Sequence, residues 1–227
     1  MKKYFLQRKR NIPFLTKCLI ALYTILFFNS LDAQVRFGGG VVAGFNASQM
    51  DGDNAAGFNK VGGTIGLRAT MQPSDVSKWL WTLDMLFSQR GSRSSQNDAG
   101  PIRSATLNYL EVPLLVNYRD WKVTDKSGNE FYKVYFTAGL SYGRLFSYKI
   151  SDNFTHPKAV WDVFEKNDVA YTGGLSYFVN RHWGFNWRYT RSANFLFHPK
   201  NHKDQIALST YPALQVYFLT FQTVWMF

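Results

Sequence analysis

Apolar and polar residues alternate with a period of two along most of the chain that follows residue 34. The alternation occurs in eight segments, namely residues 35–47, 60–71, 78–90, 107–119, 131–147, 168–179, 183–197 and 212–227. Glycine, serine, asparagine, aspartate and proline are frequent in the gaps between these segments. Because successive side chains of a β-strand point to opposite faces, this pattern predicts an all-β domain of eight strands.

The two faces of the predicted strands carry side chains of different size. In the segment 78–90, one face carries Trp79, Trp81, Leu83, Met85 and Phe87. The other face carries Leu80, Thr82, Asp84, Leu86 and Ser88. A ligand-binding soluble barrel points its bulky apolar face inward, whereas a membrane barrel points it at lipid and keeps small or polar residues inside. We therefore expect an eight-stranded antiparallel transmembrane β-barrel, an up-and-down meander with a closed polar lumen.

The gaps between segments predict how the barrel sits in a membrane. Long gaps near 51–59, 91–106, 148–167 and 198–211 alternate with shorter ones such as 180–182. Outer-membrane barrels have long outer loops and short periplasmic turns, so both termini are expected on the periplasmic side of the cell outer membrane. Four tryptophans near strand ends on that side are expected to form an aromatic girdle, namely Trp79, Trp121, Trp183 and Trp225.

The stretch "YLEVPLLVNY" (109–118) places polar residues and a proline inside an apolar run. By alternation, its apolar row faces lipid, and Glu111, Pro113 and Asn117 face the lumen. There the carboxylate of Glu111 is expected to meet Arg68 or Arg188. Proline has no backbone N–H to donate to a neighbouring strand, so a bulge or a bound water is expected at Pro113.

Charged residues collect on the inward face, and this set forms the candidate site. Its members are Arg36, Arg68, Asp84, Glu111 and Arg188. One hypothesis is that Asp84 and Glu111 pair as a general acid and base. The favoured interpretation is an ion network that closes the barrel, because eight strands leave an interior just wide enough for side chains. On this interpretation the protein is not an enzyme and has no catalytic residue.

The first residues have the layout of a secretory signal peptide. A basic stretch precedes the apolar core "CLIALYTILFF" (18–28), and Ala33 offers a small residue before Gln34. This core is shorter than the roughly 20 residues of a spanning helix. Cleavage after Ala33 is expected, which divides the chain into a leader, 1–33, and a barrel domain, 34–227. Removing the leader lowers the net charge from +11 to +6 and removes Cys18, the only cysteine, so neither nucleic-acid binding nor a disulfide is expected.

Metal and cofactor sites are not expected. His198 and His202 are four residues apart in "HPKNH", but Pro199 disfavours a helix there and no third ligand is evident. No glycine pattern typical of phosphate-binding loops is present. The long loop 148–167 contains several apolar residues and has two open interpretations. It either presents a contact surface, or folds back on the barrel rim as a cap or short helix.

Several short motifs occur in a fixed order along the chain. They are "GFNAS" (44–48), "FSQRG" (87–91), "YLEVPLLVNY" (109–118), "AGLSYGRL" (138–145) and a terminal "TVWMF". Together they resemble the small outer-membrane β-barrel family of Bacteroidota described as PorT-like. The resemblance implies an outer membrane, contact with its lipid, and barrel-assembly machinery that reads Phe227 as a carboxy-terminal signal. It also implies an association with type IX protein secretion, in which a founding member takes part.

The sequence thus favours a non-enzymatic, integral outer-membrane barrel that docks partners through its outer loops, as an accessory subunit acting alone or in a larger outer-membrane or secretion complex. Three alternatives stay open. These are a component of type IX secretion, a small outer-membrane enzyme acting on lipid or peptide, and a small-solute channel.

Overall fold

The computed structural model describes residues 35–55, 57–95, 102–151, 153–202 and 206–227. These residues form a closed antiparallel barrel in which each strand pairs with its neighbours in sequence and the last strand pairs with the first. The strands are β1 (Arg36–Asp51), β2 (Lys60–Gln72), β3 (Trp79–Arg93), β4 (Ser104–Thr124), β5 (Glu130–Ile150), β6 (Asn167–Phe178), β7 (Trp183–Ser192) and β8 (Gln215–Met226). The predicted eight-stranded meander is confirmed. The predicted leader, with its cleavage site at Ala33 and Gln34, lies outside the described residues.

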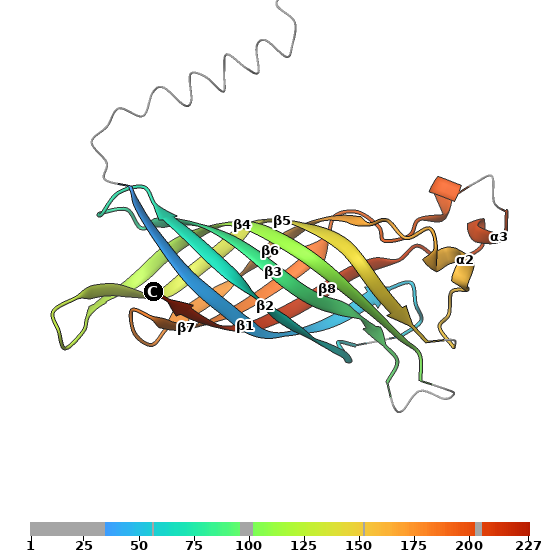
Figure 1. Cartoon of the computed structure of the whole chain (residues 1–227), viewed down its shortest axis with the longest axis horizontal. Helices are drawn as coiled ribbons and strands as arrows, with labels where there is room; N and C mark the ends of the chain where they lie inside the picture. Colours follow the sequence, from blue (N-terminus) through green and yellow to red (C-terminus); the bar gives the residue numbers. More distant parts are fainter. Residues whose placement is uncertain (1–34, 56, 96–101, 152, 203–205) are drawn as a thin grey trace, which may run out of the picture. The chain divides into compact units, whose positions relative to one another are not determined.

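The two ends of the barrel differ in their connections, as Figure 1 shows. At one end, which we call the turn end, lie the start of β1, the end of β8 and the short connections 73–78, 125–129 and 179–182. At the other, the loop end, lie the described residues of the connections 52–59, 94–103, 151–166 and 193–214. The last two contain the short helices α2 (Lys158–Trp161), η1 (Pro199–His202) and α3 (Ile206–Ser209). None of the helices in the described part of the chain has the length and apolarity needed to cross a bilayer.

Side chains alternate between exposed and buried along the strands, in the predicted phase. On β3, Trp81, Leu83 and Met85 are exposed, while Asp84 and Leu86 between them are buried. The bulky rows of the other strands also face outward. Examples are Ile65, Leu67, Leu110, Leu114, Phe136, Leu140, Tyr171, Leu175, Phe185 and Trp187. An apolar exterior around a packed interior is the arrangement of a transmembrane β-barrel.

The interior contains polar side chains along its length and two clusters of apolar side chains. Toward the loop end, buried apolar residues from strands and loops form a large cluster that includes Met50, Leu107 and Phe218. Toward the turn end, a smaller cluster forms around Val42, Phe178 and Val224. The lumen is therefore not polar throughout, because some inward positions of the strands are occupied by leucine, valine or aromatic residues.

The bulge expected at Pro113 is wrong. The β3–β4 pairs on either side, Leu83↔Leu114 and Leu86↔Glu111, have the same register, and the two pairs between them are missing. On the opposite side, Pro113 still pairs with Ser141 of β5. A proline lacks one donor, so the ladder here loses pairing toward one neighbour without a shift of register. The register shift between β4 and β5 lies instead at Asn108 and Tyr109, where Phe146 of β5 is the extra, unpaired residue.

β7 ends earlier than the alternation predicts. The predicted segment runs to residue 197, but the strand ends at Ser192. Beyond it, Leu196 and Phe197 are buried in the apolar cluster at the loop end, and Phe197 forms an isolated bridge with Leu214. The apolar residues of this segment therefore belong to a folded loop, which alternation alone cannot distinguish from a strand.

Candidate functional site

Asp84 is the centre of the interior charge network. Its side chain is completely buried on β3 and is opposite Arg68 of β2 in the strand register. Arg68 binds it through two hydrogen bonds of 2.8 Å, from Nε to Oδ1 and from Nη2 to Oδ2. Arg188 of β7 approaches from across the barrel, with 3.2 Å between Nη1 and Oδ2. This fork geometry is the strongest form of a carboxylate–guanidinium contact, so the three side chains tie distant strands together.

Glu111 is buried as predicted, but it forms no ion pair with Arg68 or Arg188. Its Oε1 accepts a hydrogen bond of 2.8 Å from the Ser141 hydroxyl of the neighbouring strand β5. It lies close enough to Arg90 and Arg188 to interact electrostatically with both, beyond ion-pair distance. The expected contact fails because side-chain direction and register across the barrel decide which charges meet, and neither can be read from alternation alone.

A second buried ion pair was not predicted from the sequence. Arg90 of β3 and Asp168 of β6 are 2.6 Å apart between Nη2 and Oδ2. The Arg90 guanidinium also lies 3.8 Å from the ring centre of Tyr109 and 4.7 Å from that of Phe218. A signal for it exists in the sequence, because Arg90 continues the inward row of Asp84, Leu86 and Ser88 by two residues. The stacking and the charge pairing together hold one buried cation in place.

In the middle of the barrel interior, the charges of the buried strand residues balance. Three buried arginines, Arg68, Arg90 and Arg188, face three buried carboxylates, Asp84, Glu111 and Asp168. The cavity that Glu111 and Pro113 line has a volume of about 10 Å³, enough for one water molecule. Both oxygens of Asp84 accept from arginines. The paired-carboxylate arrangement therefore leaves no space in which a substrate would reach both groups.

Arg36 does not belong to this network, contrary to the prediction. It lies at the start of β1, where its side chain is 63% exposed and forms a 2.5 Å ion pair with Asp75 in the connection between β2 and β3. Arg36 does lie on the inward-facing row of β1, but this row extends past the end of the closed barrel. Alternation gives the face of a residue and not its height along the barrel axis.

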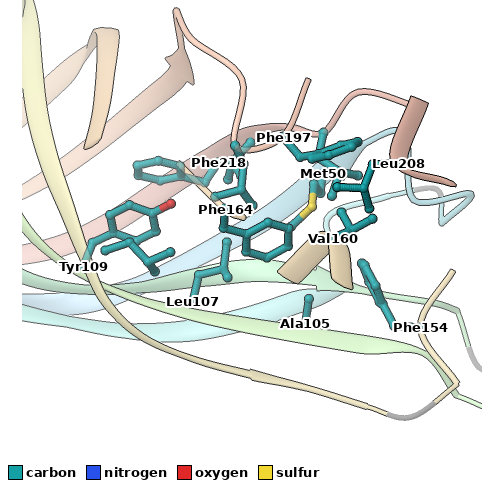
Figure 2. Close-up of a cluster of buried hydrophobic side chains, with 14 residues drawn as sticks. Met50, Ala105, Leu107, Tyr109, Phe154, Val160, Phe164, Phe197, Leu208 and Phe218 are labelled. Carbon is teal, nitrogen blue, oxygen red and sulfur yellow. The ribbon is translucent and has the colours of Figure 1, made fainter. Parts of the chain in front are cut away.

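The loop end is closed by its own connections. We call the described residues of 151–166 and 193–214 the loop cap. Figure 2 shows Phe154, Val160 and Phe164 of the first connection and Phe197 and Leu208 of the second packing with strand residues in one cluster. Of the two interpretations of the long loop, folding back on the rim with a short helix is the one observed. Its phenylalanines are buried, so they do not form an exposed aromatic surface.

His156 is buried within the loop cap. Its Nε2 lies 3.1 Å from the carbonyl oxygen of Pro212, and its ring contacts those of Phe154, Phe197 and Tyr211. Burial lowers the pKa of the imidazole, because charging it inside an apolar cluster is unfavourable. The Pro212 carbonyl and, more weakly, Asp53 act in the opposite direction. The ring is thus a neutral linker between the two connections of the cap.

The four predicted girdle tryptophans lie toward the turn end. Trp79 is 52% exposed and its ring contacts that of Tyr118, while Trp183 pairs in register with Trp225 and their rings are 4.8 Å apart. Trp121 is 58% exposed near the end of β4, where its φ is 56°. Phe227 donates its backbone N–H to the carbonyl of Gly39, and its side chain is exposed. The girdle and the assembly signal stay predictions.

No group of three potential metal ligands occurs among the residues that the structure describes. His198 lies beside Phe195 in the loop cap, with a ring distance of 4.7 Å, and the side chain of His202 lies outside the description. His198 instead lines a groove of about 510 Å³ on the loop cap. The other lining residues are Val163, Glu165, Asn194, Phe195, Leu196, Lys200 and Asn201. The lining combines the apolar side chains of Val163, Phe195 and Leu196 with the charged side chains of Glu165 and Lys200.

Comparison with known proteins gives one family and several solved structures. The family model described as "Outer membrane protein beta-barrel domain" matches residues 18–216. No curated protein matches the chain. The structure is similar to that of Ail, the attachment invasion locus protein of Yersinia pestis, in complex with the heparin analogue sucrose octasulfate, with 11% identity, a TM-score of 0.42 and coverage of 85% of this chain and 99% of Ail. It is also similar to the outer membrane protein OprG from Pseudomonas aeruginosa, with 16% identity, a TM-score of 0.34 and coverage of 85% and 94%.

Proposed function

Because the chain belongs to the outer membrane protein beta-barrel domain family, we propose that it is a non-enzymatic outer-membrane barrel that docks a protein partner through its loop cap. In the proposed orientation both termini and the short turns face the periplasm, and the loop cap faces outward. The observation that carries the proposal is the folded state of the cap. Two connections far apart in sequence share one apolar cluster and present a groove of about 510 Å³.

A folded cap favours binding because its surface is ordered before a partner arrives. Ordering a loop on binding costs free energy, and a pre-ordered surface avoids this cost. Phe195 is 40% exposed at the groove and offers an apolar anchor, with Glu165 and Lys200 as charged groups at its edge. Protein interfaces combine an apolar centre with a polar rim, and Phe195 with Glu165 and Lys200 supplies both kinds of group.

The proposal is tested by photo-crosslinking in intact cells. A photo-reactive residue at Asn201, beside the groove, is expected to give a discrete protein adduct that the change Phe195→Glu abolishes. The same photo-reactive residue at Val76, which is exposed at the turn end, is the matched control and should not give that adduct. No adduct from the groove, or an adduct that survives Phe195→Glu, would contradict docking at this surface. Identifying the adduct also decides whether the partner is a secretion component.

The small-solute channel alternative has its own test. The apolar cluster at the loop end and the ion network below it fill the interior, so the purified barrel in a planar bilayer is expected to show no sustained conductance. A steady open level, above that of a bilayer without protein, would replace the docking proposal with the channel hypothesis.

A further inference from the structure

The turn end, in contrast to the loop end, opens into a basic cavity. An inner cavity of about 200 Å³ adjoins an outer one of about 630 Å³, and the two share Arg36, Gln72, Arg119, Tyr135 and Arg181 as lining residues. We call this the arginine vestibule. One of its walls is the β4–β5 hairpin, which contributes Lys122, Glu130, Phe131 and Tyr132. The hairpin projects beyond the rest of the barrel in Figure 1, and this deepens the vestibule.

The inner cavity is lined by four arginines, Arg36, Arg68, Arg119 and Arg181, and no carboxylate lines it. Arg68 is already paired with Asp84, and Arg36 with Asp75. The outer cavity adds two carboxylates, but each is already paired. Asp75 binds Arg36 at 2.5 Å, and Glu130 binds Lys122 at 2.5 Å.

Two arginines of the vestibule have no carboxylate partner. Among the described residues, neither Arg119 nor Arg181 has a carboxylate oxygen within ion-pair distance. Asp125 is close enough to Arg181 for a weak electrostatic interaction only. In the middle of the barrel, three arginines balance three carboxylates. In the vestibule, by contrast, the positive charges of Arg119 and Arg181 are not balanced by a carboxylate.

Arg119 is held in position by several contacts, but its guanidinium group has an N–H donor without a hydrogen-bond partner. Only 8% of the residue is exposed. Its Nη1 donates a hydrogen bond of 3.1 Å to Gln72 Oε1, and its Nη2 donates a second hydrogen bond to the carbonyl oxygen of Ser77. The guanidinium also lies 4.7 Å from the ring centre of Tyr132. Its Nε is buried without a hydrogen-bond partner. A buried donor without a partner is unfavourable, so Arg119 keeps unused hydrogen-bonding capacity beside the inner cavity that it lines.

From this arrangement we propose that the arginine vestibule binds a phosphate group. Guanidinium groups bind phosphate through two parallel hydrogen bonds, and a partly buried site strengthens each of them. The inner cavity suits a compact anion, while Tyr135 and Phe178, stacked at 4.7 Å, provide an apolar wall for the part that carries it. Inorganic phosphate, a small organic phosphate and a phospholipid headgroup share this chemistry. The site lies at the opposite end from the docking groove and is independent of it.

The test uses the barrel domain in zwitterionic detergent micelles, titrated with inorganic phosphate at constant ionic strength and followed by NMR and calorimetry. Saturable binding is expected, with shifts confined to residues of the turn end. The double variant Arg119→Gln/Arg181→Gln should weaken it by about tenfold or more, since each charge-assisted contact contributes substantially. Arg144→Gln is the matched control, because Arg144 is exposed and bonds Asn167 at the other end of β5. Its affinity should equal that of the unaltered protein.

The single variant Arg181→Gln tests binding even if the double variant fails to fold, because Arg181 is exposed in a turn and its substitution should not disturb the barrel. It should weaken phosphate binding several-fold while the NMR spectrum of the barrel is retained. Non-saturable binding, or equal weakening by Arg144→Gln, would overturn the proposal. Repeating the titration in micelles of a maltoside detergent, which contains no phosphate, with and without added phospholipid identifies the source of the phosphate. Weaker apparent binding with both phosphatidylcholine and phosphatidylglycerol indicates that a headgroup occupies the site, and binding unchanged by either lipid indicates a free phosphate.

Discussion

Single residues determine whether the interior of the barrel is stable, and Asp84 is the carboxylate on which two buried arginines converge. It accepts two hydrogen bonds from Arg68 and one from Arg188, and none of the three side chains is more than 8% exposed. A buried ion pair adds little net stability compared with apolar packing, but removing one partner leaves an uncompensated charge. The loss is therefore expected to exceed that of any exposed pair.

We predict that Asp84→Asn lowers the free energy of unfolding by about 3–5 kcal/mol, because two arginines then lack their carboxylate. The measurement is urea-induced unfolding in detergent, read from tryptophan fluorescence. Asp120→Asn is the control, since Asp120 and Lys78 form an exposed pair at 3.4 Å. Its effect should stay below about 1 kcal/mol. Equal effects of the two changes would show that the interior network does not support the fold.

Gly143 is a second position where a single added atom, the Cβ of a larger residue, is expected to lower the stability of the barrel. A Cβ there would lie 2.9 Å from Nη2 of Arg90 and 3.2 Å from Cδ1 of Tyr109. Arg90 cannot move away easily, because Asp168 and two aromatic rings hold it. We predict that Gly143→Ala destabilises the barrel by about 1–3 kcal/mol, as overpacking does. In the same unfolding assay Gly63→Ala should be nearly neutral, because nothing lies within 4 Å of its Cβ position. A neutral Gly143→Ala would mean that Arg90 is mobile.

At this scale the sequence predicts the faces of residues better than their partners. Alternation correctly places Asp84, Glu111 and Arg188 inside, because period two is a property of each strand alone. It misplaces Arg36, whose row continues beyond the closed barrel. The partner of Glu111 and the pair Arg90–Asp168 depend on contacts across the barrel, which come from strand tilt and register.

Among the secondary-structure elements, those set by local sequence signals can be predicted, and those set by contacts between distant residues cannot. Most strand bounds agree with the predicted segments to within a few residues, since alternation and turn residues are local signals. The sequence left the cap as one of two interpretations of the loop 148–167. Its packing could not be predicted, because Val160 and Leu208 meet in it from connections far apart in sequence. A folded loop and a strand extension have similar apolar content, so the end of β7 was also missed.

The loop cap is expected to weaken in acid. Burial lowers the pKa of His156, whereas in an unfolded loop the imidazole has its ordinary pKa of about 6.5. The cap is therefore fully stable above about pH 6.5 and loses stability as the pH falls below that value, because only the opened loop takes up the proton readily. Burial raises the pKa of the Asp53 carboxyl, so its protonation would favour the folded state and does not account for a loss of stability in acid.

The measurement is the intensity of the Val160 methyl signals, recorded by NMR between about pH 7.5 and about pH 5.5, the range around an ordinary histidine pKa. Val160 is completely buried in the cap, so its signals report the packed state. They should weaken or shift on acidification. His156→Phe retains an aromatic ring without a titrating group and should remove this dependence. Signals that are insensitive to pH in the unaltered protein would contradict the assignment of His156 as the acid-sensitive contact.

The whole molecule combines an apolar exterior, a closed interior and two unlike ends. The loop end is packed with apolar side chains, and the turn end opens into a vestibule with free positive charge. Such a barrel joins two surfaces without a passage between them, so its proposed work is binding at each end. All of this depends on the direction in which the bulky rows point. If they faced inward, neither the ion network nor the vestibule would exist.

Nitroxide labels on single cysteines along β3, in lipid bilayers, test that direction most directly. The barrel domain contains no natural cysteine, so each label is unique. Labels at Leu83, Met85 and Phe87 should show high accessibility to oxygen, which concentrates in hydrocarbon, and labels at Leu86 and Ser88 should show low accessibility. The expected result is an alternation of period two with maxima at the odd-numbered residues. The opposite phase, or uniform accessibility along the strand, would contradict the account.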